Sequence, residues 1–103
     1  MADKIEEMRA SYQLSGEDSI LPMLDDFLTE QEIREYCWSV LRTFPDLKKE
    51  DWFIGIEGGD YIYGFSGHYV FITDDIWSFN LIAKPAVLEL LAGRIRALKA
   101  SAF

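Results

Sequence analysis

The sequence lacks most of the residues from which catalytic and metal sites are built. It contains one cysteine, Cys37, and one histidine, His68, among its 103 residues. A single cysteine excludes an internal disulfide and suits a reducing compartment. One cysteine and one histidine are also too few to build the usual zinc sites. We therefore expect no metal, no cofactor and a cytoplasmic location.

Long hydrophobic runs are missing as well. Half of the residues are hydrophobic, yet no run approaches the roughly 18 apolar residues that a membrane span needs. The first nine residues, MADKIEEMR, are charged and have no apolar segment of the kind found in signal peptides. This composition predicts a globular chain that binds no membrane.

Basic residues are scarce and unevenly placed. The chain has 10 Lys and Arg against 18 Asp and Glu, which gives a net charge of −8. Residues 1–75 hold 17 acids and 6 bases, whereas residues 76–103 hold 1 acid and 4 bases. Direct nucleic-acid binding is disfavoured, because it depends on concentrated Lys and Arg. Attraction to a protein with a basic surface is favoured instead, although many globular proteins are acidic without such a partner.

The sequence contains no motif that is typical of an enzyme. Cys37 falls on the apolar stripe of a predicted helix, whereas reactive thiols need exposure and positive neighbours. His68 has no carboxylate nearby in sequence that would orient it as a general base. Gly58-Gly59 lacks the lysine and the following helix of a phosphate-binding loop. We predict no catalytic residue, and an enzyme or small-molecule binder is the least favoured class.

Two helices are predicted by apolar residues that recur at spacings of three and four. The more regular pattern covers residues 30–44, and Thr29 with Glu32 fits a capping box at its start. Pro85 suits the first turn of the second helix. We expect a single domain over 1–103 with four parts: an N-terminal helical segment or arm at 1–28, a helix at 29–44, a β-meander at 52–82 and a C-terminal helix at 85–100.

Alternating patterns between these helices predict the strands of the meander, at 52–57, 61–65 and 68–73, with a possible fourth at 76–82. Gly58-Gly59 and Ser66-Gly67 fit two-residue hairpin turns. These turns place Trp52 opposite Phe65 and Phe65 opposite His68. The predicted fold class is α+β, with two layers, in which an antiparallel meander of three or four strands packs against the N-terminal helical segment and the C-terminal helix.

Both faces of this meander are rich in apolar side chains. Nine of the chain's 15 aromatic residues lie between Trp52 and Phe79, and alternation divides them between the two faces. One face should receive the helices at 30–44 and 85–100, and it carries Trp52, Ile54, Ile56, Tyr61, Tyr63, Phe65, His68, Val70 and Ile72. The other carries an aromatic trough beside Gly55 and Gly64, formed by Phe53, Ile62, Tyr69 and Phe71. A sheet with one core normally has one polar face, so residues 1–28, a partner or a second copy should cover this trough.

Carboxylates are expected to converge at one end of the meander. They belong to Glu57, Asp60, Asp74 and Asp75. Hard cations bind such oxygen clusters, but no calcium-loop pattern is present. A patch that faces a basic partner is favoured over a metal site, and simple solvation of the turn is the remaining alternative.

Two further groups of residues are candidates for partner contact. Arg34 and Trp38 are one turn apart beside the apolar stripe of their helix, and Trp77 follows the Asp74-Asp75 turn. Tryptophan and arginine are enriched among the residues that dominate binding energies. The same residues can also form an amphipathic border over a core.

These observations predict a small acidic binding protein that occupies a basic surface of a partner protein. Its sharpest version is an inhibitor: an immunity or antitoxin-like protein, or a phage-encoded antagonist such as an anti-CRISPR or a DNA mimic. The alternative is a homodimer or larger homo-oligomer, a structural or adaptor module that pairs through the apolar sheet face.

Overall fold

The structure is a computed structural model that describes residues 3–101 of the chain. Residues 1–2, at the start of the predicted N-terminal segment, and residues 102–103, after the predicted C-terminal helix, lie outside the described residues. In chain order the elements are α1 (Lys4–Ser11), β1 (Asp18–Ser19), α2 (Leu21–Leu24), α3 (Glu30–Leu41), β2 (Lys48–Ile54), β3 (Gly58–Phe65), β4 (His68–Asp75), β5 (Phe79–Ala83) and α4 (Pro85–Ser101).

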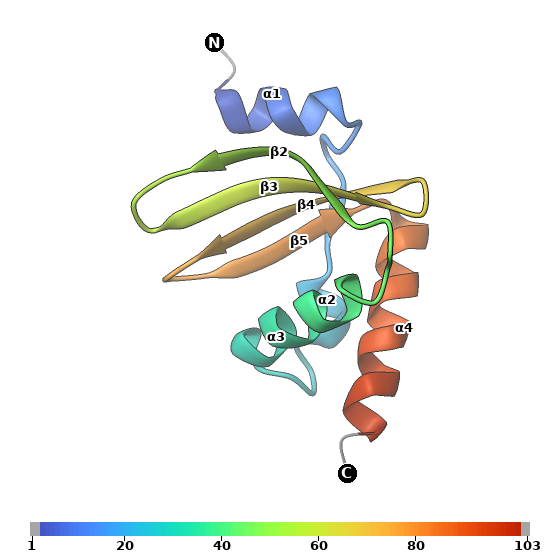
Figure 1. Ribbon diagram of the computed structural model, residues 1–103. Helices are drawn as coiled ribbons and strands as arrows, with labels where there is room; N and C mark the ends of the chain where they lie inside the picture. Colours follow the sequence, from blue (N-terminus) through green and yellow to red (C-terminus); the bar gives the residue numbers. More distant parts are fainter. Residues whose placement is uncertain (1–2, 102–103) are drawn as a thin grey trace.

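One antiparallel sheet of five strands, in the order β1-β5-β4-β3-β2, forms the middle of the molecule. Helix α1 lies on one face of the sheet, and α2, α3 and α4 lie on the other (Figure 1). The α+β class is therefore confirmed, with five strands where three or four were predicted. The extra strand, β1, has two residues and pairs with β5 where the chain passes from one face to the other.

The two long helices begin where their sequences predict. The Thr29 hydroxyl accepts the Glu32 backbone N–H at 3.1 Å, and the Glu32 carboxylate accepts the Thr29 N–H at 3.0 Å, so the capping box is present. Helix α4 starts at Pro85, where the missing N–H of proline costs nothing.

The main core lies between the sheet and these helices. Phe65, Val70 and Ile72 from the sheet pack with Ile33 of α3 and Leu91 of α4, and all five are buried. Alternation along the strands had assigned the three sheet residues to the helix-covered face, which is confirmed.

The register of the second hairpin is confirmed, whereas that of the first is wrong. Phe65 lies opposite His68, and the turn residues Ser66 and Gly67 both have positive φ, of 49° and 79°. In the first hairpin Trp52 lies opposite Tyr61, not Phe65, and residues 55–57 form the turn. This is a shift of four positions along β3. An even shift keeps each side chain on its face but slides β2 toward its hairpin turn.

The Gly58-Gly59 pair was predicted as the turn but opens strand β3. Gly58 has a φ of 152° and pairs with Asp75 of β4. A Cβ atom at this position would come within 2.4 Å of the Asp74 oxygen and the Asp75 Cα. The glycine therefore permits a close approach of two strands rather than a reversal of the chain.

Candidate partner-binding site

Helix α1 covers the centre of the aromatic trough. Met8 of α1 and Leu14, which follows it, form a small buried cluster with Ile62 of β3 and Phe71 of β4. Phe71 is 3% exposed and Ile62 is fully buried, and the Arg9 guanidinium lies 5.3 Å from the centre of the Phe71 ring. These two trough residues form a second core layer, as one of the alternatives predicted, and a partner cannot reach them in this structure.

The ends of the trough remain partly open. Tyr69 is 42% exposed, although its ring packs edge-on against Tyr12 at 5.0 Å. Burial is the main cause that raises the pKa of Tyr12, and the nearby carboxylates of Asp51 and Glu50 raise it further. Phe53, at the other end of the trough, is 46% exposed.

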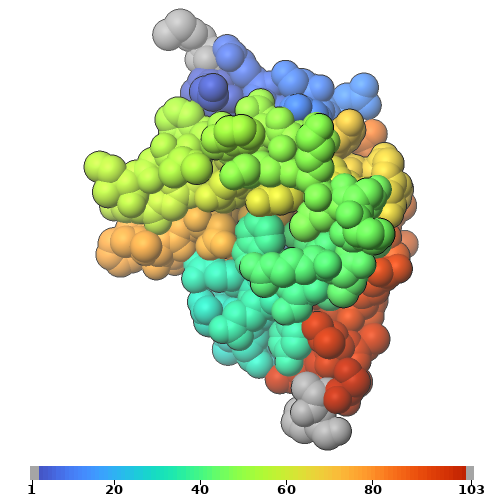
Figure 2. Space-filling model, in the orientation of Figure 1, coloured from blue at the N-terminus to red at the C-terminus, as the bar shows by residue number. Residues whose placement is uncertain are grey.

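Exposed apolar side chains concentrate at one end of the sheet, where the β2–β3 turn lies beside the β4–β5 turn. This end projects beyond α3 at the left of Figures 1 and 2. We call it the sheet tip and define it by its exposed large residues: Trp52, Phe53, Ile54, Ile56, Ile76 and Trp77. Ile56 is fully exposed, and Trp77 is 74% exposed. A monomeric protein rarely exposes so many large apolar side chains in one place unless they bind something.

Glu57 joins the two turns of the sheet tip. Its backbone carbonyl accepts the Ile76 N–H at 2.9 Å, and its carboxylate accepts the Trp77 indole N–H at 2.9 Å. The Asp75 carboxylate accepts the backbone N–H groups of Trp77 and Ser78 at 2.8 and 2.7 Å. The bonds to these two N–H groups hold the pKa of Asp75 below its usual value.

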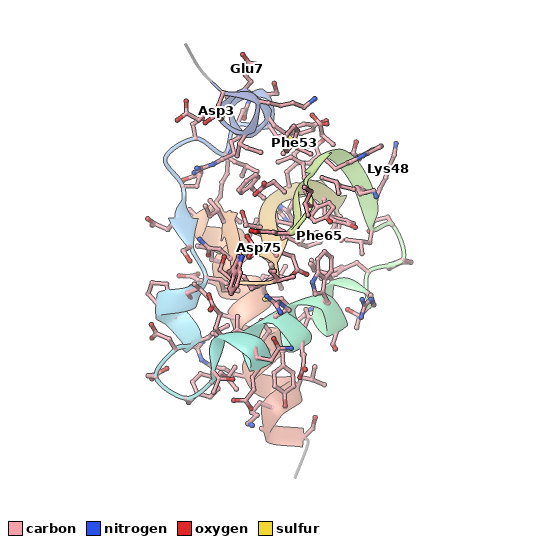
Figure 3. The ribbon with its side chains drawn as sticks, turned by 90° about the vertical axis from the view of Figure 1, so that its left-hand side faces the viewer. Asp3, Glu7, Lys48, Phe53, Phe65 and Asp75 are labelled. Carbon is pink, nitrogen blue, oxygen red and sulfur yellow. The ribbon has the colours of Figure 1, made fainter. Side chains whose placement is uncertain are left out.

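Three of the four predicted carboxylates line one open depression at the sheet tip. This depression has a volume of about 420 Å³, and its side-chain lining is formed by Phe53, Ile56, Glu57, Asp60 and Asp75. Asp60 also accepts the Thr73 hydroxyl at 2.7 Å. Figure 3 views the molecule from this end and shows Phe53 on the α1 side of the sheet. The predicted convergence of Glu57, Asp60 and Asp75 is therefore present, with Phe53 beside them.

The fourth carboxylate, Asp74, belongs to a different arrangement. It forms an ion pair with Arg34 at 3.1 Å and accepts the Trp38 indole N–H at 2.9 Å. Arg34 also donates to the carbonyls of Asp75 and Ser78 at 2.7 and 3.2 Å. All three side chains are partly buried and tie α3 to the end of β4. Arg34 and Trp38 thus hold the fold together next to the sheet tip, and they do not lie open for a partner.

No protein-family model, curated protein or solved structure matches this chain.

Four sheet-tip residues were not among the predicted contact residues. Trp52, Ile54 and Ile56 had been assigned to the helix-covered face as core, and Ile76 had not been singled out. The shifted register carries Trp52 and Ile54 beyond the edge of α3, and it places Ile56 in the turn. The one signal in the sequence for this shifted register was Gly55, which offered a second candidate position for the turn.

The residues considered for catalysis lie in unrelated places. Burial raises the pKa of the Cys37 thiol to about 12, which leaves it protonated at neutral pH. His68 is exposed, and its ring packs on Phe65 at 5.9 Å. Within residues 3–101 no three side chains from His, Cys, Asp and Glu are grouped as a metal site requires. Among the same residues no helix combines the length and apolar character needed to cross a bilayer.

Proposed function

We propose that this chain is a small, non-enzymatic cytoplasmic protein that inhibits a partner protein by occupying a basic surface on it. The observation that supports this best is the sheet tip, where exposed apolar residues adjoin the carboxylates of Glu57, Asp60 and Asp75. Interfaces combine apolar anchors with polar surroundings that set orientation and partner choice. An acidic border selects partners rich in Lys and Arg.

We place the proposed function among inhibitors because a surface of this kind acts by occupying its partner. An exposed tip with fixed side chains and no catalytic group can block a site by filling it. The proposed classes are those that would act by occupying a basic target: an immunity or antitoxin-like protein, an anti-CRISPR protein or a DNA mimic.

A panel of purified basic nucleases and nucleic-acid-binding proteins tests this function. Binding should be measured by calorimetry at about 0.05 and 0.5 M salt, since salt screens exposed charges. We expect binding that weakens as salt rises. The Glu57→Gln variant should bind the partner more weakly because it loses the negative charge. Its amide oxygen can still accept the Trp77 indole N–H, so the shape of the tip is kept. Glu89→Gln on α4 is the matched control, with the same loss of charge away from the tip. Absence of binding across the panel at low salt contradicts the proposal.

Self-association is the second candidate function. The face that suggested it is covered at its centre by α1, so the sheet tip is the surface that would have to pair. Two acidic tips repel each other, which disfavours this arrangement. Light scattering at tens of micromolar distinguishes the candidates, because a stable dimer that dissociates on Trp77→Ser substitution would favour self-association.

A further inference from the structure

The sheet tip is apolar on both of its faces and at its end. Trp52 and Ile54 point to the α3 side of the sheet, whereas Phe53 points to the α1 side. Ile56 and Trp77 occupy the turns at the very end. The tip extends beyond α3, so the helix layer leaves its lower face uncovered (Figure 2).

This two-sided character limits the shape of the partner. A flat surface can bury one face of a projecting tip, but the other face stays in water. Burial contributes roughly 25 cal/mol per Å² of apolar surface removed from water, so a partner that encloses both faces gains substantially more. We propose, on the basis of the function proposed above, that the sheet tip is a wedge that enters a cleft of the partner, with an apolar floor and a border of Lys and Arg.

Charge complementarity identifies the border of that cleft. Three carboxylates line the depression at the tip: those of Glu57, Asp60 and Asp75. Within residues 3–101 none of the three forms an ion pair, whereas Asp74 is neutralised by Arg34. The Lys49 ammonium lies over the Trp52 ring, 4.7 Å from its centre. The depression beside Phe53 has room for a lysine or arginine side chain from the partner.

The wedge is also held in shape before it binds. Glu57 connects the β2–β3 turn to Ile76 and Trp77, and Asp75 fixes the backbone of the β4–β5 turn. Each immobilised side chain normally costs about 0.5–1.5 kcal/mol on association. Glu57 is therefore a positioning residue, which presents Trp77 in one orientation as well as contributing charge.

The decisive experiment substitutes one residue on each face of the wedge. The variants are Phe53→Thr for the α1 face and Ile54→Thr for the α3 face, because threonine is well tolerated in strands. Affinity is measured against the member of the basic panel that binds most tightly. We expect each variant to lose about tenfold or more, as anchor residues do, and an oligonucleotide that fills the partner's cleft should compete with the wild type. Leu98→Thr on α4 is the control and should bind as the wild type does.

The outcomes separate the wedge from the broader function. Loss of affinity in one face variant alone, or no competition by the oligonucleotide, overturns the wedge while the binding function stands. Absence of any binding overturns both. Thermal melts of each variant exclude loss of the fold as the cause.

The positioning role of Glu57 has its own readout. Glu57→Gln should keep the NMR signal of the Trp77 indole N–H in place, whereas Glu57→Ala should move it toward that of a free indole. We expect Glu57→Ala to bind more weakly than Glu57→Gln at high salt, where the difference in charge is screened. Equal binding by the two variants at high salt overturns the positioning role.

Discussion

The two ends of the sheet are built from similar residues, but helices cover only one of them. At the covered end, α1 packs on one face and α3 and α4 pack on the other, so Phe71 and Ile72 are buried. At the sheet tip, strand β2 carries Phe53 and Ile54, which are about half exposed. Composition is therefore not what separates core from surface in this protein.

Placement in the sheet makes the difference, because Phe53 and Ile54 lie on the edge strand β2 next to its hairpin turn, whereas β4 is an inner strand. Helix α1 has eight residues, and its buried contact with the sheet is made by Met8 with Leu14 behind it. On the other face α3 is tied to the end of β4 by Arg34 and Trp38, which bind the Asp74 carboxylate. Beyond that point no helix follows the strands (Figure 1). The apolar surplus of the meander is partly core and partly an exposed, braced tip, which indicates two separate roles.

The strongest way to test this comparison is a matched pair on one sheet face. Phe71→Ala should lower the free energy of unfolding by about 3–5 kcal/mol, as large-to-small changes in a core do. Phe53→Ala, on the same face, should lower it by less than about 1 kcal/mol. Urea denaturation of both variants measures the difference. Equal losses would show that the tip is as much a part of the core as the covered end.

A second matched pair tests how the shape of the tip is specified. Gly58→Ala introduces a Cβ 2.4 Å from backbone atoms of β4, at a φ of 152° that side chains rarely adopt. Overpacking of this kind should cost about 1–3 kcal/mol and move the Trp77 backbone signals. At Gly55 a Cβ would make only an ordinary contact, 3.9 Å from the Gly58 oxygen, so Gly55→Ala should change stability by about 0.5 kcal/mol or less. A Gly58→Ala protein with unchanged stability would mean that β3 and β4 do not approach this closely.

Sequence patterns predicted the parts of the fold that local chemistry determines. The capping box at Thr29 and the start of α4 at Pro85 depend on a few neighbouring residues, and both are present. The Ser66-Gly67 turn has positive φ at both residues, and its hairpin register is confirmed. The first hairpin offered glycines at 55, 58 and 59, and the choice among them depends on the approach of β4 to Gly58. That approach is a tertiary contact, which the local sequence does not contain.

The candidate site was predicted in part for the same reason. The convergence of Glu57, Asp60 and Asp75 survives the register error, because an even shift preserves the faces and the acids stay near the turn. The exposure of Trp52 and Ile54 depends on where α3 ends its contact with the sheet. The burial of Ile62 and Phe71 depends on α1, whose weak apolar pattern left both a docked helix and a loose arm open.

The attachment of α1 gives a third, smaller effect. Met8→Ala should weaken the cover over the trough by up to about 2 kcal/mol, the lower part of the range for such core truncations, because α1 can detach while the sheet stays folded. Hydrogen exchange should show faster exchange in Lys4–Ser11 and little change in β3 and β4. Glu7→Ala, exposed on the same helix, is the control. If the sheet amides lose protection to the same extent as α1, then α1 belongs to one cooperative unit with the sheet.

Acid titration of the β4–β5 turn is the smallest expected effect and the one most specific to the tip. Hydrogen bonds from the Trp77 and Ser78 backbone hold the pKa of Asp75 below the usual value of about 3.9. A lowered pKa in the folded state means that ionised Asp75 stabilises the turn above its unfolded pKa. This contribution is lost as the pH falls through the lower, folded value. The Trp77 backbone N–H signal should therefore shift below about pH 4, while Asp75→Asn, which keeps an acceptor oxygen but cannot titrate, should remove that step. An unchanged titration in Asp75→Asn would assign the transition to a different group, and ionised Asp75 would then not be what stabilises the turn.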